Sequence, residues 1–312
     1  EFYRKVSKVI SFAAQLIKGF RSRIVLRLLL SPESFDQLVG LNADYVISCG
    51  AASAGMNLLG SGFFGGKTLI ILKPGILSFK SFDFVVAPEH DVKKAADNCV
   101  VTRAALNLID KNYLSEKTAQ LLNRFSHLKS NYRTKIGVLI GGNTKNVEFT
   151  ESVAKILVHQ IKEVALQLNA DILLTTSRRT PDHIEQLIWK EFKKFERCAL
   201  LISASKTDIP EAVGGILGIS DCVVVSGESI SMVSEAVSSG KKTVVFNLVS
   251  SEEKTDFNKY ERFMEKLSEQ GYIALCSVKG ISQAVYCVMS DKMHLKHLSD
   301  KDVVRHAIKK VL

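Results

Sequence analysis

Short apolar runs rich in β-branched residues recur along the chain, and the apolar positions within each run are continuous rather than alternating. Parallel strands that are covered on both faces have this pattern. Longer stretches separate several of the runs, and residues 148–168 place apolar side chains at helical spacing. The alternation of strand and helix predicts an α/β fold with right-handed crossovers. The eight expected strands lie within residues 44–50, 67–72, 82–88, 135–142, 170–177, 198–204, 221–227 and 242–247.

A polar stretch at residues 111–134, with one expected helix, separates two groups of these strands. We therefore predict two Rossmann-like α/β domains, at residues 1–130 and 131–312. The first group contains fewer strands than a complete doubly wound sheet requires. We expect the first strand and glycine-rich turn of that domain to precede residue 1.

Composition narrows the class of protein. The chain has 312 residues, of which 46% are hydrophobic and 24% charged, as in globular proteins. Lys or Arg interrupts every apolar run before it is long enough to cross a bilayer. The six cysteines form no Cys-x-x-Cys pair, which favours a reducing, cytoplasmic compartment and disfavours structural zinc. No His, Asp or Glu cluster has metal-ligand spacing, so we predict no metal site.

Basic charge is concentrated near the start of the chain. The net charge is +10, and residues 1–30 carry seven basic side chains and one acidic one. The apolar residues of this segment fall at helical spacing, which allows two interpretations. A basic amphipathic helix can dock on an anionic membrane surface, or it can cover a domain and leave its basic side in water, which we favour. No zinc-finger or aromatic RNA-binding signature is present, so nucleic acid is the partner least expected.

Three strands of the second domain are followed by small, hydroxyl-bearing or basic residues. Ligands of open parallel sheets lie beyond the carboxyl ends of the strands, where helix N-termini and arginine favour phosphate. Taken singly, each loop has a structural explanation: a tight turn, a helix cap or a solvated basic pair. Together they favour a phosphate- or nucleotide-bearing ligand. The candidate residues are Gly141, Gly142, Asn143, Thr144, Ser177, Arg178, Arg179, Gly227, Glu228, Ser229 and Ser231.

The first domain offers a candidate general base. Glu89, His90 and Asp91 follow an expected strand, and histidine titrates near neutral pH. The alternative is a helix start capped by Asp91, with His90 structural, and the residues alone leave both open. Ser48 and Cys49 have no base nearby in sequence, so a nucleophile there is poorly supported.

Five motifs in order carry a resemblance to a known family: "FDFVVAPEHD", "NCVVTRAAL", "IGVLIGGNTK", "LLTTSRRTP" and "VVVSGESISMVSEAVSSGK". Over residues 43–275 the chain resembles the mitochondrial fission protein family named after a plant elongated-mitochondria protein. The resemblance implies a GT-B-like fold, with two Rossmann-like domains facing a cleft. It also implies nucleotide-sugar at the second domain and acceptor at the first. Plant members are linked to recruiting a dynamin-like protein to mitochondria. Members usually open with a strand and glycine-rich loop ahead of the region corresponding to residue 1.

The resemblance also assigns roles within residues 223–246, which are similar to the donor helix of the N-acetylglucosaminyltransferase that completes the peptidoglycan lipid precursor. Ser229, Ser231 and the helix N–H groups would contact the diphosphate. Glu235 lies four residues after Ser231, on nearly the same helical face, and its carboxylate can accept both ribose hydroxyls. The alternative is a surface acid that pairs with Lys241 or Lys242.

These observations predict a metal-independent glycosyltransferase that uses a nucleotide-sugar as donor substrate, with no cofactor. The acceptor would lie at the cytoplasmic face of the membrane, and Glu89 or His90 would be the base. Arg178 and Arg179 would offset the charge of the leaving group. No Gly-x-Gly-x-x-Gly fingerprint is present, which disfavours an NAD-dependent epimerase. The alternative function is a non-catalytic adaptor that keeps the fold and binds a protein partner.

Overall fold

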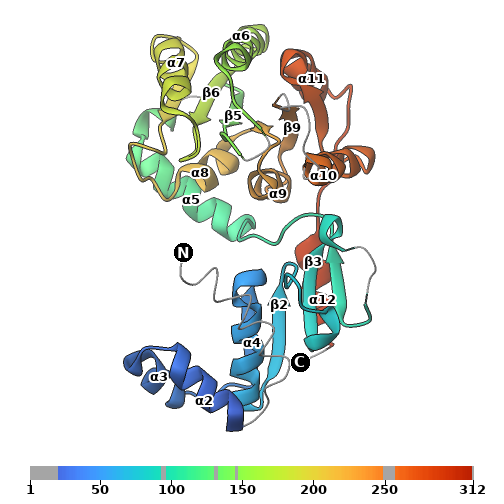
Figure 1. Ribbon diagram of the computed structural model, residues 1–312. Helices are drawn as coiled ribbons and strands as arrows, with labels where there is room; N and C mark the ends of the chain where they lie inside the picture. The colour runs from blue at the N-terminus through green and yellow to red at the C-terminus, as the bar shows by residue number, and fades with distance from the viewer. Residues whose placement is uncertain (1–19, 93–95, 130–132, 145–146, 249–256, 311–312) are drawn as a thin grey trace. The chain divides into compact units, whose positions relative to one another are not determined.

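The computed structural model describes residues 20–92, 96–129, 133–144, 147–248 and 257–310, drawn as ribbons in Figure 1. The chain forms two compact units. Unit 1 comprises Glu1–Leu106 and Asp300–Leu312, and unit 2 comprises Asn107–Ser299. Most of the basic amphipathic segment that the sequence predicts lies outside the described residues, which begin at Phe20.

Unit 1 is built on a four-stranded parallel sheet in the order β1-β2-β3-β4. Its strands run in sequence order, so each crossover leads to the neighbouring strand. One crossover is a full helix, α4, which begins after Gly50, where φ is 76° and a side chain would be strained. The elements are α2 (Phe20–Leu29), α3 (Pro32–Val39), β1 (Tyr45–Cys49), α4 (Ala51–Phe64), β2 (Lys67–Ile71), η1 (Phe79–Ser81), β3 (Phe84–Pro88), η2 (Glu89–Asp91), β4 (Cys99–Thr102) and α12 (Asp300–Ile308).

Both faces of this sheet are covered, which explains the continuous apolar runs. Ile70 and Val85 pack with Ala54 of α4 on one face, and Leu69 and Phe84 pack with α12 on the other. The α12 helix comes from the far end of the sequence. Buried Asp300, at its first position, accepts a hydrogen bond from the Ala104 backbone N–H at 2.8 Å and so fixes the helix against the end of β4.

Unit 2 contains a six-stranded parallel sheet in the order β10-β9-β8-β5-β6-β7. From β5 the chain winds outward to β7, then returns through α8 to β8 on the other side of β5. The order therefore reverses between β5 and β8. The elements are α5 (Lys111–Arg124), η3 (Ser126–Leu128), β5 (Lys135–Leu139), α6 (Glu151–Gln167), β6 (Asp171–Thr175), α7 (Asp182–Phe192), β7 (Cys198–Ile202), α8 (Ala212–Ile219), β8 (Cys222–Ser226), α9 (Ile230–Ser238), β9 (Lys242–Asn247), α10 (Phe257–Glu269), β10 (Ala274–Ser277), η4 (Val278–Gly280) and α11 (Ile281–Met289).

Successive residues of the unit 2 strands face two separate cores. Val138 of β5 belongs to the core under α6, α7 and α11, and Leu139 belongs to the core that α5, α8, α9 and α10 cover. Figure 1 shows these two helix layers above and below the strands of unit 2. The result is a doubly wound sheet that is buried on both faces.

All eight strands expected from the sequence are present, and residues 148–168 contain α6 as expected. The sequence predicts a domain boundary between residues 130 and 131, whereas the structure divides the chain after Leu106. The helix α5 therefore belongs to unit 2, because it packs against α8 of that unit. The backbone of α8 lies so close to α5 that a Cβ at Gly215 would meet the side chain of Leu121. Two short strands, β4 and β10, were not expected.

Candidate functional site

The candidate site lies where the strand order of unit 2 reverses. β5 is hydrogen-bonded to β8 on one side and to β6 on the other, so the loops that follow these three strands emerge side by side. Open α/β sheets bind ligands at this kind of reversal, outside the carboxyl ends of the strands. The three loops singled out in the sequence are therefore neighbours.

Hydrogen bonds join the loop after β5 to the loop after β8. The Gly141 backbone N–H donates to Ser226 Oγ at 2.8 Å, and the Gly142 N–H donates to Glu228 Oε1 at 3.1 Å. A Cβ at Gly141 would collide with the Glu228 carboxylate, and a Cβ at Gly142 would collide with the backbone of Arg179. Both glycines are therefore required by close packing between loops.

The loop after β6 is held against the same glycines. Thr180 Oγ1 donates to the Gly141 carbonyl at 2.5 Å and accepts from the Ser177 N–H at 3.0 Å. The Asn143 N–H donates to the Arg179 carbonyl at 3.2 Å. Arg178 and Arg179 are exposed at the tip of this loop. The backbone network fixes the tip, so both guanidinium groups extend from a rigid base.

The β5 loop and the start of α9 differ in whether their backbone N–H groups have hydrogen-bond acceptors. Each backbone N–H from Gly141 to Thr144 has an acceptor within the protein, and the Asn143 and Thr144 side chains accept from the amides of Phe149 and Val147. These residues therefore shape the loop. In α9, by contrast, the N–H groups of Ile230 and Ser231 have no acceptor among the described residues. A helix start of this kind binds anions.

α9 places the other expected contacts. Ser229 caps the helix, with its Oγ accepting from the Met232 N–H at 3.5 Å, and Ser231 is exposed one turn before Glu235. Glu235 is half-buried, and burial raises the pKa of its carboxyl. None of the residues that the structure describes forms an ion pair or hydrogen bond with this carboxylate.

The alternative role for Glu235, pairing with a lysine, is not what the structure shows. Lys241 Nζ donates to the Gly218 carbonyl at 3.0 Å, and Lys242 Nζ bonds Asp291 Oδ1 at 2.5 Å. Both lysines therefore have other partners. Glu235 is a desolvated acceptor, available to a hydroxyl-bearing ligand.

The buried carboxylate of Glu185, which the sequence motifs did not indicate, joins two loops at this edge of the sheet. Glu185 of α7 accepts from Thr176 Oγ1 and from Ser205 Oγ, both at 2.5 Å. Burial raises the pKa of Glu185, but the hydrogen bonds from these hydroxyls and Ser203 outweigh it, so the pKa is lowered. Glu185 thereby ties the loop after β6 to the loop after β7. Acceptor and hydroxyls come from three separate segments, so no local motif reveals them.

The candidate bases lie in η2 of unit 1, directly after β3. The His90 side chain is only 4% exposed, and its Nε2 lies 3.8 Å from Asp91 Oδ2. Pro88, and not Asp91, occupies the cap position of η2. Glu89 is half-buried.

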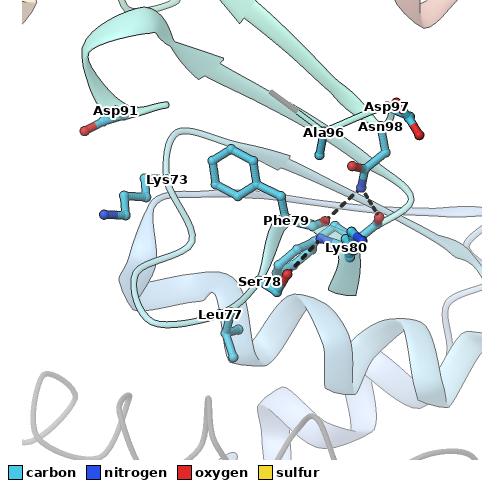
Figure 2. A pocket seen from close by; sticks show the side chains of 10 residues that line it. Lys73, Leu77, Ser78, Phe79, Lys80, Asp91, Ala96, Asp97 and Asn98 are labelled. Atoms are coloured by element: carbon cyan, nitrogen blue, oxygen red, sulfur yellow. Dashed lines mark hydrogen bonds between the residues drawn. The ribbon is translucent and has the colours of Figure 1, made fainter. Parts of the chain in front are cut away.

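Unit 1 also contains a hollow of about 910 Å³ on the crossovers that connect β2, β3 and β4. The described residues of these crossovers contain 3₁₀ turns in place of full helices. In Figure 2 the Phe79 ring lies between Lys73 and Asp91 on one side and Asn98 on the other. Asn98 Nδ2 donates to the carbonyls of Phe79 and Phe82, which fixes the wall of the hollow.

No group of three or more His, Cys, Asp or Glu among the described residues could hold a metal ion. No helix among them is both long and apolar enough to span a bilayer.

Comparison with known proteins identifies the family. The family model described as mitochondrial fission ELM1 matches residues 11–312. The chain belongs to the mitochondrial fission ELM1 family. This confirms the resemblance indicated by the five motifs.

Two curated proteins are similar to this ELM1-family chain. The Rickettsia prowazekii (strain Madrid E) protein RP120 is 28% identical over 185 residues, which cover 58% of this chain and 48% of that protein. The mitochondrial fission protein ELM1 of Arabidopsis thaliana is 24% identical over 216 residues, which cover 62% of this chain and 47% of that protein. The chain thus spans about half the length of the curated relatives it matches.

Solved structures show the fold of this family member. A candidate UDP-N-acetylglucosamine 2-epimerase from Listeria monocytogenes matches 93% of this chain and 72% of its own, with a TM-score of 0.52 and 10% identity. MnaA from S. aureus, solved with UDP, matches 93% of this chain and 73% of its own, with a TM-score of 0.50 and 12% identity. At these identities the likeness concerns fold alone, and the fold is α/β and GT-B-like.

Proposed function

We propose that unit 2 binds a nucleotide-sugar at the reversal between β5 and β8. The observation that carries this proposal is the combination on α9 of two amides without acceptors, at Ile230 and Ser231, with a desolvated carboxylate one turn later, at Glu235. Amides at a helix start bind the diphosphate, and a carboxylate accepts hydrogen bonds from ribose hydroxyls.

The neighbouring loops supply the remaining contacts. Arg178, Arg179 and Ser177 lie on the rigid loop after β6, where the guanidinium groups can bind phosphate oxygens. Gly141, Gly142, Asn143 and Thr144 hold the β5 loop in shape, and Gly227, Glu228 and Ser229 lead into α9. The MnaA structure was solved with UDP, a nucleoside diphosphate, which supports choosing this ligand class.

The reaction that we propose is metal-independent glycosyl transfer. An acceptor hydroxyl oxygen forms a bond to the anomeric carbon, and the bond from that carbon to the diphosphate breaks. The electron pair leaves with the nucleoside diphosphate, and Arg178 and Arg179 offset its charge. Glu89 or His90 takes the proton of the hydroxyl. The hollow beside Phe79 has room for part of an acceptor, with an aromatic ring and charges of both signs in its wall.

A second function, that of an adaptor binding a protein partner, is favoured by one comparison. The Arabidopsis thaliana relative is called a mitochondrial fission protein, a description that names no sugar chemistry. The same fold can serve transferases, epimerases and proteins without catalysis. An adaptor would keep the sheets and cores but would not need free α9 amides or an unpaired Glu235.

Isothermal titration with UDP-glucose, UDP-N-acetylglucosamine, ADP-glucose and GDP-mannose separates the two functions. The transferase proposal expects at least one of these donors to bind in the micromolar-to-millimolar range, roughly −8 to −4 kcal/mol. A donor that binds is then tested for hydrolysis and transfer by product analysis, with divalent metal chelated. Absence of binding for every donor would reject the donor site and favour the adaptor.

A further inference from the structure

Glu185 and Glu228 are buried glutamates at the same edge of the unit 2 sheet, and their surroundings differ. Glu185 accepts hydrogen bonds from two hydroxyl groups, which stabilise its charged form. Glu228 accepts from the Gly142 N–H through Oε1, but its Oε2 is buried and has no hydrogen-bond partner among the described residues. The Glu228 side chain is only 1% exposed. Hydroxyl groups of the protein therefore donate hydrogen bonds to both oxygens of Glu185, whereas only one oxygen of Glu228 accepts a hydrogen bond from a described residue.

The charges around Glu228 compensate it weakly. Arg179, from the β6 loop, is the cation that faces it, with Nη2 at 3.9 Å from Oε1 and about half of its side chain exposed to water. The β5 loop contributes backbone of Gly141 and Gly142, and β8 contributes the Ser226 hydroxyl. Asn247, at the end of β9, is uncharged and also has a buried oxygen without a partner.

Burial of a charge with one distant, half-exposed counter-ion disfavours the charged form. Burial accordingly raises the pKa of Glu228, against the lowering effects of Ser226, the backbone and Arg179. Hydroxyl donors lower the pKa of Glu185, so the two buried carboxyls shift in opposite directions. The missing donor at Oε2 is the geometric origin of this difference.

We propose that Glu228 is a neutral acid when the nucleotide-sugar is bound, so that Arg179 is free to bind a phosphate oxygen instead of facing a carboxylate. This inference rests on the donor site proposed above. The proton comes from solvent, so binding of the diphosphate is accompanied by proton uptake. In the charged form the same carboxylate repels the diphosphate and competes with it for Arg179.

The proposal has a defined pH dependence. Donor affinity is highest below the pKa of Glu228 in the free protein and falls as pH rises above it. In the range where the free protein is charged and the complex is neutral, affinity falls by about tenfold per pH unit. A nucleotide-sugar is the suitable probe, because its diphosphate is esterified at both ends and does not titrate near neutral pH. A free nucleoside diphosphate does titrate there, with a second ionisation near about pH 6.

The test is calorimetric titration of the tightest-binding donor of the four-member panel, from pH 5.5 to 9, in two buffers with different ionisation enthalpies. Wild type is expected to take up close to one proton at the alkaline end. Glu228→Gln keeps the shape, keeps an acceptor for Gly142 and is permanently neutral. It is expected to bind with little pH dependence, and more tightly than wild type in the pH range where Glu228 of the free wild-type protein is charged.

Arg179→Gln is a second variant, and it is expected to bind more weakly at every pH. Loss of the cation raises the pKa of Glu228, so the alkaline fall in affinity should begin at higher pH. A midpoint that stays in place would contradict the role of Glu228. A wild-type affinity that does not change with pH, with no proton uptake, would also contradict it. Weaker binding by Glu228→Gln at all pH values would show instead that the carboxylate acts as a charged acceptor.

A ligand-free measurement distinguishes failure of this inference from failure of the donor site. Wild type should lose unfolding free energy as pH rises through the pKa of Glu228, and Glu228→Gln should not. Glu185→Gln is the matched control, because it should lose stability at neutral pH and keep the alkaline fall. If no donor binds but this pattern is found, the donor site is rejected and the ligand part of the inference with it. If donors bind and the pattern is absent, only the inference is rejected.

Discussion

Replacement of Glu235 by alanine tests the ribose contact of the proposed donor site. The carboxylate is half-buried and has no partner among the described residues, so a ligand would supply its hydrogen bonds. Hydrogen bonds to a charged group contribute about 1.5–3 kcal/mol. Loss of the ribose contact should therefore weaken donor binding roughly tenfold to a hundredfold.

The ligand-free protein should respond in the opposite way. The variant loses no ion pair with a described residue, removes a desolvated carboxyl and places alanine, the best helix former, in α9. The unfolding free energy should stay the same or rise by about 0–1 kcal/mol. Because the pKa of Glu235 is raised, its unfavourable charging grows with pH, so the gain should be largest at alkaline pH.

Glu211→Ala is the matched control. Glu211 is buried, its Oε1 bonds Arg124 Nε at 2.5 Å, and neither residue belongs to the three loops of the site. Its removal should cost about 1–2 kcal/mol of stability and leave donor affinity unchanged. Calorimetric titration gives the affinities, and urea unfolding gives the stabilities. Equal donor affinity for wild type and Glu235→Ala would refute the ribose contact, as would a large loss of stability with unchanged binding.

Four further predictions concern Gly142, Glu185, Asp300 and the binding of residues 1–30 to membranes. Gly142→Ala should lose about 1–3 kcal/mol, measured by urea unfolding, because its Cβ would overlap the Arg179 backbone; an unchanged midpoint would contradict this contact. Glu185→Ala should lose a similar amount at neutral pH. Because the pKa of Glu185 is lowered, this loss should shrink below about pH 4, and a constant loss would contradict the sign. Asp300→Ala should speed amide exchange in α12 relative to α6, and equal protection would show that Asp300 does not anchor it. The interpretation that we favour for residues 1–30, a helix that covers a domain, predicts that the protein does not co-sediment with anionic vesicles at low salt; recovery in the pellet would support membrane docking instead.

The strands could be predicted because burial on both faces leaves a local mark. Runs such as residues 221–227 are apolar at consecutive positions, and the structure covers them from both sides. β4 was missed because its four residues lie in a segment that also fits a helix start, and β10 because it is equally short. The extent of unit 1 depends on the contact of α12 with β2 and β3, which joins residues far apart in sequence and has no local signature.

The site was predictable to the level of loops. The rule that ligands lie beyond strand ends placed residues 141–144, 175–181 and 226–231 together, and the structure makes them neighbours. This rule does not predict which backbone N–H groups are left without an acceptor. The N–H groups of the glycine-rich loop bond within the protein, whereas two N–H groups at the start of α9 have no acceptor among the described residues. The burial and weak charge compensation of Glu228 arise where the loops after β5, β6 and β8 meet. No single sequence motif contains all three loops, so none can reveal these surroundings.

The contribution of α12 to unit 1 has a consequence for synthesis of the chain. Unit 2 is contiguous in sequence, but the face of unit 1 formed by Leu69, Phe84 and Val86 is completed by residues that follow unit 2. At typical elongation rates, roughly 10–40 s pass between the emergence of the two parts. Until then, this apolar face lacks its cover while the ribosome is still extending the chain. Nascent unit 1 should therefore be a better chaperone substrate than unit 2, which can close its cores before α12 exists.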